Sequence, residues 1–361
     1  MDTSINKAFL TLTAITIAIF LILLPLTINQ GKHPNNDYHE TPSSTTTSIP
    51  TPIGTTTTQN TTTATTQTTI TTTSTQTKPS NITLCTYFYV WYGSPDHPWT
   101  NIIDMPLLGY YNSNNTQVMT QQLEWIREAG IDCLIISWWG PGHYTDIVAQ
   151  KVFQLLSQYG LQGSIMIEPW LGDEDPASNT TIYNATWWNN TLHYIQTHYI
   201  EEYGHSYLHL DGHPLILAFN PIGMKYRPNT TMYTIRIVGN DIDNARYQDW
   251  DYWPDYDKNL TGKLRIRTDG YVAITPRYDD EHFRPGNVPS YDPNLTKNWY
   301  QKQWQWILNN TQNISIITIA TWNEYHERTM IEPHYDATSP IKDPYYLYNI
   351  TRKYIDQIKQ N

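Results

Sequence analysis

The chain has 361 residues, a formal net charge of −11 at pH 7 and only two cysteines. It holds 33 acidic residues against 22 lysines and arginines, and it is rich in aromatic side chains, with 14 Trp and 28 Tyr. An acidic chain without a basic run is not expected to bind nucleic acid, and it favours neutral partners such as sugars over polyanions.

The N-terminal part begins with a long apolar run. Residues 8–28 are uncharged and dominated by Ile, Leu, Ala and Phe, and Lys7 precedes them. About 20 apolar residues suffice to cross the hydrocarbon core of a membrane, and the run ends without the small residues of a cleavage site. The pattern favours a signal anchor over a cleaved signal peptide. Residues 1–7 are then expected in the cytoplasm, and the rest of this single-pass protein outside the cell membrane or in a lumen.

Residues 29–80 predict a disordered Ser/Thr-rich stalk. Between Thr41 and Ser80, 21 of 40 residues are Thr and 5 are Ser, so few large apolar side chains are present to form a core. Such tracts are typical of O-glycosylated stalks. Twelve Asn-x-Ser/Thr sequons along the chain predict N-glycosylation as well. Residues 81–361 remain, and they suit one catalytic barrel domain.

Within residues 81–361, apolar runs of strand length alternate with helical patterns, which predicts βα units around a parallel sheet. The predicted strands span residues 85–92, 131–138, 164–167, 214–219, 234–238, 271–275 and 314–320. The predicted helices span residues 118–129, 146–159, 184–203, 299–309 and 345–359. With an eighth strand expected near residues 264–268, the pattern favours an α/β fold, a single (β/α)8 barrel of the TIM type. A doubly wound open sheet is the alternative, but its glycine fingerprint after the first strand is missing.

The two cysteines, Cys85 and Cys133, both lie in predicted strands. Two buried thiols or one disulfide between neighbouring strands are equally compatible with their positions, and export would permit the disulfide. No further Cys/His cluster accompanies them, so they do not predict a zinc site.

Aromatic and acidic residues follow several predicted strands. The first strand ends at Trp91-Tyr92, the second at Trp138-Trp139, and the third is followed by Glu168. Active sites of barrels form at these carboxyl ends, and flat aromatic faces suit sugar rings. Because successive strand residues point to opposite faces, one of the two tryptophans is expected in the core.

The last predicted strand leads to Glu324 and Glu327. Cleavage of a glycosidic bond usually needs two carboxyl groups, one that donates a proton and one that acts as base or nucleophile. Like charges close together, with partial burial, raise one pKa and keep that group protonated. Two exposed glutamates on a solvated loop are the alternative, but Trp322, Tyr325 and His326 are unusual for such a loop. Glu168 suits either a sugar hydroxyl or an arginine partner.

Four segments together resemble glycoside hydrolase family 99, the endo-α-mannosidases and endo-α-mannanases. They are residues 87–95 (YFYVWYGSP), 167–170 (IEPW), 278–285 (YDDEHFRP) and 322–333 (WNEYHERTMIEP). The last is the most specific, and the similarity runs in order over nearly all of residues 81–361.

The resemblance implies a retaining hydrolase of α-mannose-containing glycans that needs no metal or cofactor. Glu324 would be the base that deprotonates the 2-hydroxyl of the sugar, which then attacks C1, and Glu327 would be the general acid/base at the leaving oxygen. The positions that match residues lining the substrate cleft in the family are Tyr89, Tyr92, Glu168, Tyr278, Arg284 and Asn323. The aromatic residues at the strand ends add Trp139 as a predicted substrate-binding residue.

Three residues depart from the family pattern. Tyr325 stands where the family usually has Trp, and Arg328 and Arg277 stand where it has Gly. Residues 240–269 also form a shorter stretch than their counterpart. An arginine beside the acid is expected to narrow the cleft or to change the pKa of the acid. A non-catalytic carbohydrate-binding or scaffold protein, or a hydrolase of another α-linked glycan, are the competing hypotheses.

Overall fold

A computed structural model describes residues 82–168, 184–219, 227–239, 248–254, 264–287 and 291–360. The predicted membrane helix and stalk, and Pro169 and Trp170 of the IEPW segment, lie outside these residues. Within the described ranges, no helix combines the length and the hydropathy that a membrane span requires.

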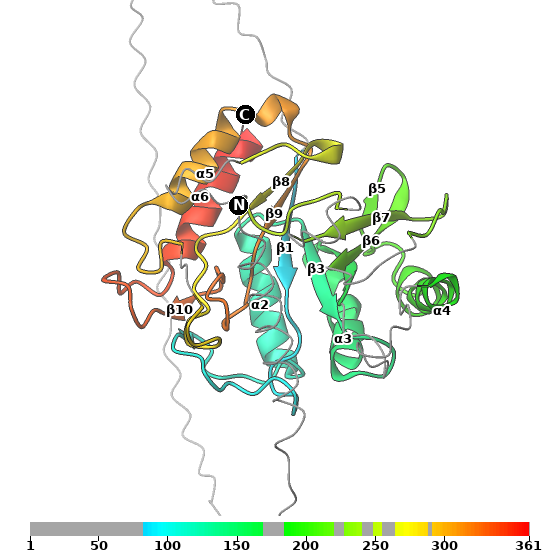
Figure 1. The fold of residues 1–361 in the computed structure, drawn as a ribbon, viewed down its shortest axis with the longest axis horizontal. Helices are drawn as coiled ribbons and strands as arrows, with labels where there is room; N and C mark the ends of the chain where they lie inside the picture. Colours follow the sequence, from blue (N-terminus) through cyan, green and yellow to red (C-terminus); the bar gives the residue numbers. More distant parts are fainter. Residues whose placement is uncertain are drawn as a thin grey trace, which may run out of the picture. The chain divides into compact units, whose positions relative to one another are not determined.

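One curled sheet of seven parallel strands forms the centre of the fold (Figure 1). The strands occur in the order β7-β6-β4-β3-β1-β9-β8, so that β1 lies between β3 and β9. Their bounds are Thr83–Phe88 (β1), Cys133–Trp138 (β3), Gln162–Ile167 (β4), His213–Phe219 (β6), Thr234–Val238 (β7), Tyr271–Ile274 (β8) and Ile316–Ile319 (β9). Two short antiparallel pairs join β5 (His209–Leu210) to β6, and β2 (Met105–Pro106) to β10 (His334–Tyr335). The seven predicted strands and the parallel β/α architecture are confirmed.

The five predicted helices are also present. They are α2 (Thr116–Glu128), α3 (Tyr144–Tyr159), α4 (Ala185–Ile195), α5 (Trp299–Leu308) and α6 (Tyr346–Gln360), and a π-helical segment, Gln196–Ile200, continues α4. Local signals set their ends: the Asn115 side chain accepts hydrogen bonds from the first turn of α2, and Gly160 ends α3 in the left-handed conformation. Helices α5 and α6 lie side by side (Figure 1).

Alternation along the strands divides the buried residues into two layers. In β1, Leu84 and Phe88 join the large cluster that the sheet shares with the helices. Cys85, Tyr87 and, just past the strand, Tyr89 belong to a second cluster on the other face of the sheet. This period of two lets both faces of the strands be buried, as in other parallel sheets.

The predicted eighth strand is misplaced. Residues 264–266 form no strand, Arg267 makes only an antiparallel bridge to Tyr271, and a 3-10 turn, Thr268–Gly270, separates the two. Trp250 lies instead between the two outer strands. It forms a parallel bridge with Val238 of β7, and its ring stacks on Tyr271 of β8 at 4.2 Å between centroids. Aromatic contacts, rather than a strand at 264–268, therefore link β7 to β8.

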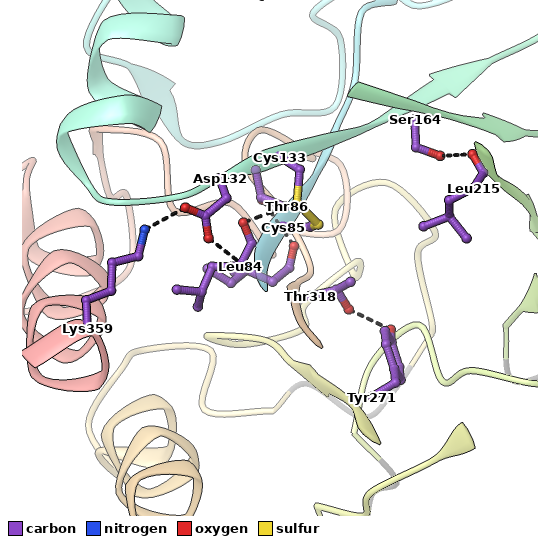
Figure 2. Close-up of a disulfide and its surroundings, with 11 residues drawn as sticks. Leu84, Cys85, Thr86, Asp132, Cys133, Ser164, Leu215, Tyr271, Thr318 and Lys359 are labelled. Atoms are coloured by element: carbon purple, nitrogen blue, oxygen red, sulfur yellow. Dashed lines mark hydrogen bonds and ion pairs between the residues drawn. A yellow bond between two sulfur atoms is a disulfide. The ribbon is translucent and has the colours of Figure 1, made fainter. Parts of the chain in front are cut away.

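Cys85 and Cys133 form a disulfide between β1 and β3, which settles the question that the sequence left open (Figure 2). The two residues are register partners, and both are fully buried. In the same view, Asp132 accepts hydrogen bonds from the Leu84 backbone N–H at 2.9 Å and from Lys359 Nζ at 2.6 Å. Asp132 thus ties α6 to the start of β1.

Candidate active site

The site residues follow the carboxyl ends of five strands. Tyr89 comes directly after β1, Trp139 after β3, Glu168 after β4, Tyr278 after β8, and residues 323–327 after β9. Parallel strands bring these ends to the same edge of the sheet, where barrel active sites are built.

Glu324 is buried and surrounded by hydrogen-bond donors. Its Oε1 accepts from the backbone N–H of His326 at 3.2 Å and lies 3.1 Å from His326 Nδ1. Its Oε2 accepts from the backbone N–H of Glu327 at 2.6 Å. Donors on both oxygens suit an ionised carboxylate and fix its orientation.

Glu327 lies on the same turn but in a different environment. Its side chain is 17% exposed, and its Oε1 accepts from Arg284 Nη1 at 3.2 Å. Burial first, and then the nearby charge of Glu324, raise the pKa of Glu327 to about 8, although Arg284 opposes the shift. The charged groups that act on it are Glu324, Arg284 and Asp280. Glu327 in turn helps to raise the pKa of three neighbouring tyrosines, Tyr278, Tyr252 and Tyr89.

Glu168 is a further buried carboxyl group at this edge. Burial raises its pKa to about 7, Glu324 adds to the shift, and a hydrogen bond from Ser137 Oγ at 2.7 Å opposes it. Among the described residues, Glu168 therefore pairs with the Ser137 hydroxyl and not with an arginine.

Asn323 and the tyrosines of the first strand form a support for the turn. Asn323 Oδ1 accepts from the Tyr89 backbone N–H at 2.8 Å, and its Nδ2 donates to the Tyr89 carbonyl at 2.8 Å. The Tyr92 hydroxyl donates to the Asn323 carbonyl at 3.0 Å and accepts from the Tyr325 N–H at 2.9 Å. Asn323 and Tyr92 are fully buried. Their predicted contact with substrate stays a prediction, and their observed contacts fix the turn of Glu324.

Aromatic residues accompany the carboxyl groups. Trp138 belongs to the core, whereas Trp139 is partly exposed, so the expected division between the two is confirmed. Sequence reasoning missed His97, which stacks on Trp91 with ring centroids 4.4 Å apart and faces Trp139 at 5.2 Å. Burial first, and then His326, lower the pKa of His97 to about 4. It lies in a loop without a recognisable pattern, so no signal in the sequence marked it.

The three residues that depart from the family pattern, Tyr325, Arg328 and Arg277, are all buried. Arg328 and Arg277 are fully buried, which contradicts the first of the two expected effects of Arg328, a narrower cleft. The second, a changed pKa of the acid, stays a prediction. Arg277 donates to Asp104 and Asp336 and lies 3.3 Å from His334 Nε2. Asp104, His334 and Asp336 place three potential metal-ligand atoms close together. The guanidinium group of Arg277 already provides the positive charge among them.

The chain was compared with known proteins, and no family model matches it. It is 22% identical to a glycoprotein endo-α-1,2-mannosidase-like protein of Mus musculus over 346 residues, which cover 76% of this chain and 72% of the relative. The Homo sapiens protein of the same description is 23% identical, and the match covers 76% and 71% of the two chains.

The fold of the chain is also similar to that of solved structures. A GH99 endo-α-mannosidase from Bacteroides thetaiotaomicron in complex with bis-tris-propane superposes with a TM-score of 0.57 at 19% identity, covering 77% of this chain and 97% of that chain. A second structure of the Bacteroides thetaiotaomicron enzyme gives a TM-score of 0.54 at 18% identity, with the same coverage. Together, the sequence and structure comparisons confirm the resemblance to glycoside hydrolase family 99 that the motifs of this chain indicated.

Proposed function

We propose that this chain is a glycoside hydrolase that cleaves α-mannosidic linkages within glycans or polysaccharides and retains the anomeric configuration. The observation that carries the proposal is the pair Glu324 and Glu327, two carboxyl groups on one turn in different environments. The hydrogen bond from the Glu327 N–H to Glu324 Oε2 links them directly. The relatives named endo-α-mannosidases support the substrate class.

In the first step, the Glu324 carboxylate accepts the proton of the sugar 2-hydroxyl, and O2 attacks C1. The bond from C1 to the leaving oxygen breaks, and Glu327 gives its proton to that oxygen. A pKa of about 8 supports this role, because the group is then mainly protonated at neutral pH.

In the second step, water opens the resulting 1,2-anhydro ring at C1. The Glu327 carboxylate accepts a proton from the water, and Glu324 returns its proton to O2. Two inversions at C1 give net retention, and both glutamates recover their starting protonation states.

The purified chain should release oligosaccharides from α-mannose-containing glycans or α-mannans. A panel of α-mannosides and α-glucans, with the products analysed by mass spectrometry, tests this. Cleavage of α-glucans alone would contradict the substrate class. Binding of mannosides without any cleavage would favour the non-catalytic carbohydrate-binding alternative.

Two aromatic residues are expected to bind the sugar. Trp139 and Tyr278 are partly exposed beyond the ends of β3 and β8, and the Tyr278 hydroxyl donates to Asp280 at 2.9 Å. Trp139→Ala or Tyr278→Ala should raise the Kd for a mannose-containing ligand roughly tenfold, because ring contacts of this type contribute on the order of 1 kcal/mol. Calorimetry gives the Kd, and circular dichroism checks the fold. An unchanged Kd in both variants would contradict the role of these rings.

We also propose that residues 8–28 anchor the protein in the membrane, with residues 29–80 as a glycosylated stalk and the enzyme outside the cytoplasm. The buried Cys85–Cys133 disulfide supports an oxidising compartment. N-terminal sequencing of the mature protein should find the apolar run still present. A mature chain that starts after residue 28 would show cleavage and exclude the anchor.

A further inference from the structure

Two arginines with no role in the proposed mechanism lie buried beside the turn that carries Glu327. The side chains of Arg277 and Arg328 are 0% and 2% exposed. A buried guanidinium group is retained only where its charge and its donors are satisfied. Three aspartates, Asp104, Asp279 and Asp336, surround the two arginines.

Arg328, the residue after Glu327, uses all three guanidinium nitrogens. Its Nε donates to Asp104 Oδ2 at 2.7 Å, and its Nη1 donates to Asp279 Oδ2 at 2.6 Å. Its Nη2 lies 3.3 Å from Asp336 Oδ1 and donates to Thr338 Oγ1 at 2.8 Å. Only a planar fork with several fixed donors reaches so many acceptors at once.

Arg277 connects this cluster to the backbone of the turn. Its Nε donates to the carbonyl of Arg328 at 2.7 Å, and its Nη2 donates to Asp104 Oδ2 at 3.0 Å. Its Nη1 donates to Asp336. Asp104 and Asp336 therefore hold both the side chain of Arg328 and, through Arg277, its carbonyl.

The backbone of Glu327 is held from the same side. Its carbonyl accepts from the Asp279 N–H at 2.9 Å, while the Asp279 side chain accepts from Arg328. Arg328 has a φ of 55°, in the left-handed region that a residue with a Cβ rarely adopts. This conformation and the two held carbonyls fix the direction of the chain on the C-terminal side of Glu327.

We propose that Arg277 and Arg328 are positioning residues, which act through Asp104, Asp279 and Asp336 to hold the Glu327 carboxyl group beside Glu324. The inference rests on the proposed role of Glu327 as the acid. Both arginines act from the buried side of the turn, while Arg284 contacts the Glu327 side chain directly.

Arg328→Lys in the full chain tests the proposal. Lysine keeps the positive charge, and its backbone must adopt the same left-handed φ, but it lacks the planar guanidinium group with its several fixed donors. We expect kcat/KM on a mannoside with a poor leaving group to fall at least about tenfold, and on an activated aryl mannoside by less than about threefold. In the protein without substrate, a 13C NMR titration of the Glu327 carboxyl carbon gives the pKa of Glu327. In the variant this pKa should be lower by about one pH unit, closer to the usual glutamate range. Glu327→Gln identifies that signal.

Arg236→Lys is the matched control. Arg236 lies in β7 and forms a bidentate salt bridge with Asp269. Asp269 precedes β8, so this pair lies at the opposite end of the strands from Glu324. This variant should change neither the ratio of the two kcat/KM values nor the titration of Glu327.

An unchanged Glu327 titration in Arg328→Lys overturns the positioning role, whatever happens to the rate. If the wild-type chain cleaves no mannoside and the titration still shifts, the positioning role stands and the proposed function falls. If Arg328→Lys does not fold, Asp336→Asn replaces it with the same measurements, because Asp336 contacts both arginines and the substitution keeps the side-chain shape.

Discussion

Glu327→Gln should lose roughly 10²- to 10⁴-fold in kcat/KM on a natural glycan and less than about tenfold on an activated aryl mannoside. A poor leaving group departs only when it is protonated, and glutamine has no proton of suitable acidity to give. The proton is available in the wild type because burial and Glu324 raise the pKa of Glu327 to about 8. Initial rates on both substrates give the ratio, and equal losses on the two would contradict an acid role.

Glu324→Gln serves as the comparison, because the base is needed whatever the leaving group. It should be impaired on both substrates, and a 2-deoxy substrate should bind to the wild type without turnover. The pH profile adds a second check. A raised pKa in a group that acts in its protonated form predicts a fall in wild-type kcat/KM above about pH 8. This alkaline limb should vanish in Glu327→Gln. Full activity of Glu324→Gln, or turnover of the 2-deoxy substrate, would exclude the proposed roles.

Reduction of the Cys85–Cys133 disulfide should lower the free energy of unfolding by about 4 kcal/mol. The cysteines are 48 residues apart, and a cross-link of that span removes about this much loop-closure entropy from the unfolded chain. The expected loss of Tm is on the order of 10 °C. Guanidinium unfolding of the native and the reduced protein measures the difference without removing any heavy atom from the core.

The variant Cys85→Ala/Cys133→Ala should be at least as unstable as the reduced protein, because it also leaves buried volume unfilled. Reductant should have no effect on its unfolding midpoint. Equal midpoints for the native and the reduced protein would mean that the disulfide does not stabilise the folded state.

The sequence allowed the strands and helices to be predicted because their apolar periodicity is strong. The predicted strand at 234–238 agrees with β7 in full, and the predicted helix at 299–309 differs from α5 by one residue. The eighth strand was misplaced because residues 264–268 alternate apolar and polar side chains as a strand does, but of these residues only Arg267 forms a bridge. The segment around Trp250 joins β7 to β8 through ring stacking, which leaves no alternation in the sequence.

The carboxyl groups of the site were predictable because each follows a strand, and position alone brings them together. The hydrogen bonds that hold these carboxyl groups in place were not predictable. The bonds of Asn323 to Tyr89 and of Arg328 to Asp104 join residues more than 200 positions apart. The position of Arg328 beside Glu327 suggested a narrower cleft, but whether a residue lines a cleft depends on the direction of its side chain. The φ of Arg328 and the buried aspartates direct its side chain inwards.

The place of β1 in the sheet has a consequence for biosynthesis. Its partner β3 follows soon, but on the other side Thr86 pairs with Ile319, 233 residues later. At about 5–20 residues per second, the ribosome needs roughly 10–50 s to make that stretch. During this time one edge of β1 has no strand to pair with, and such an edge is open to pairing with other chains. The strand that leads to Tyr89 is therefore among the first parts of the enzyme to be synthesised and among the last to be enclosed.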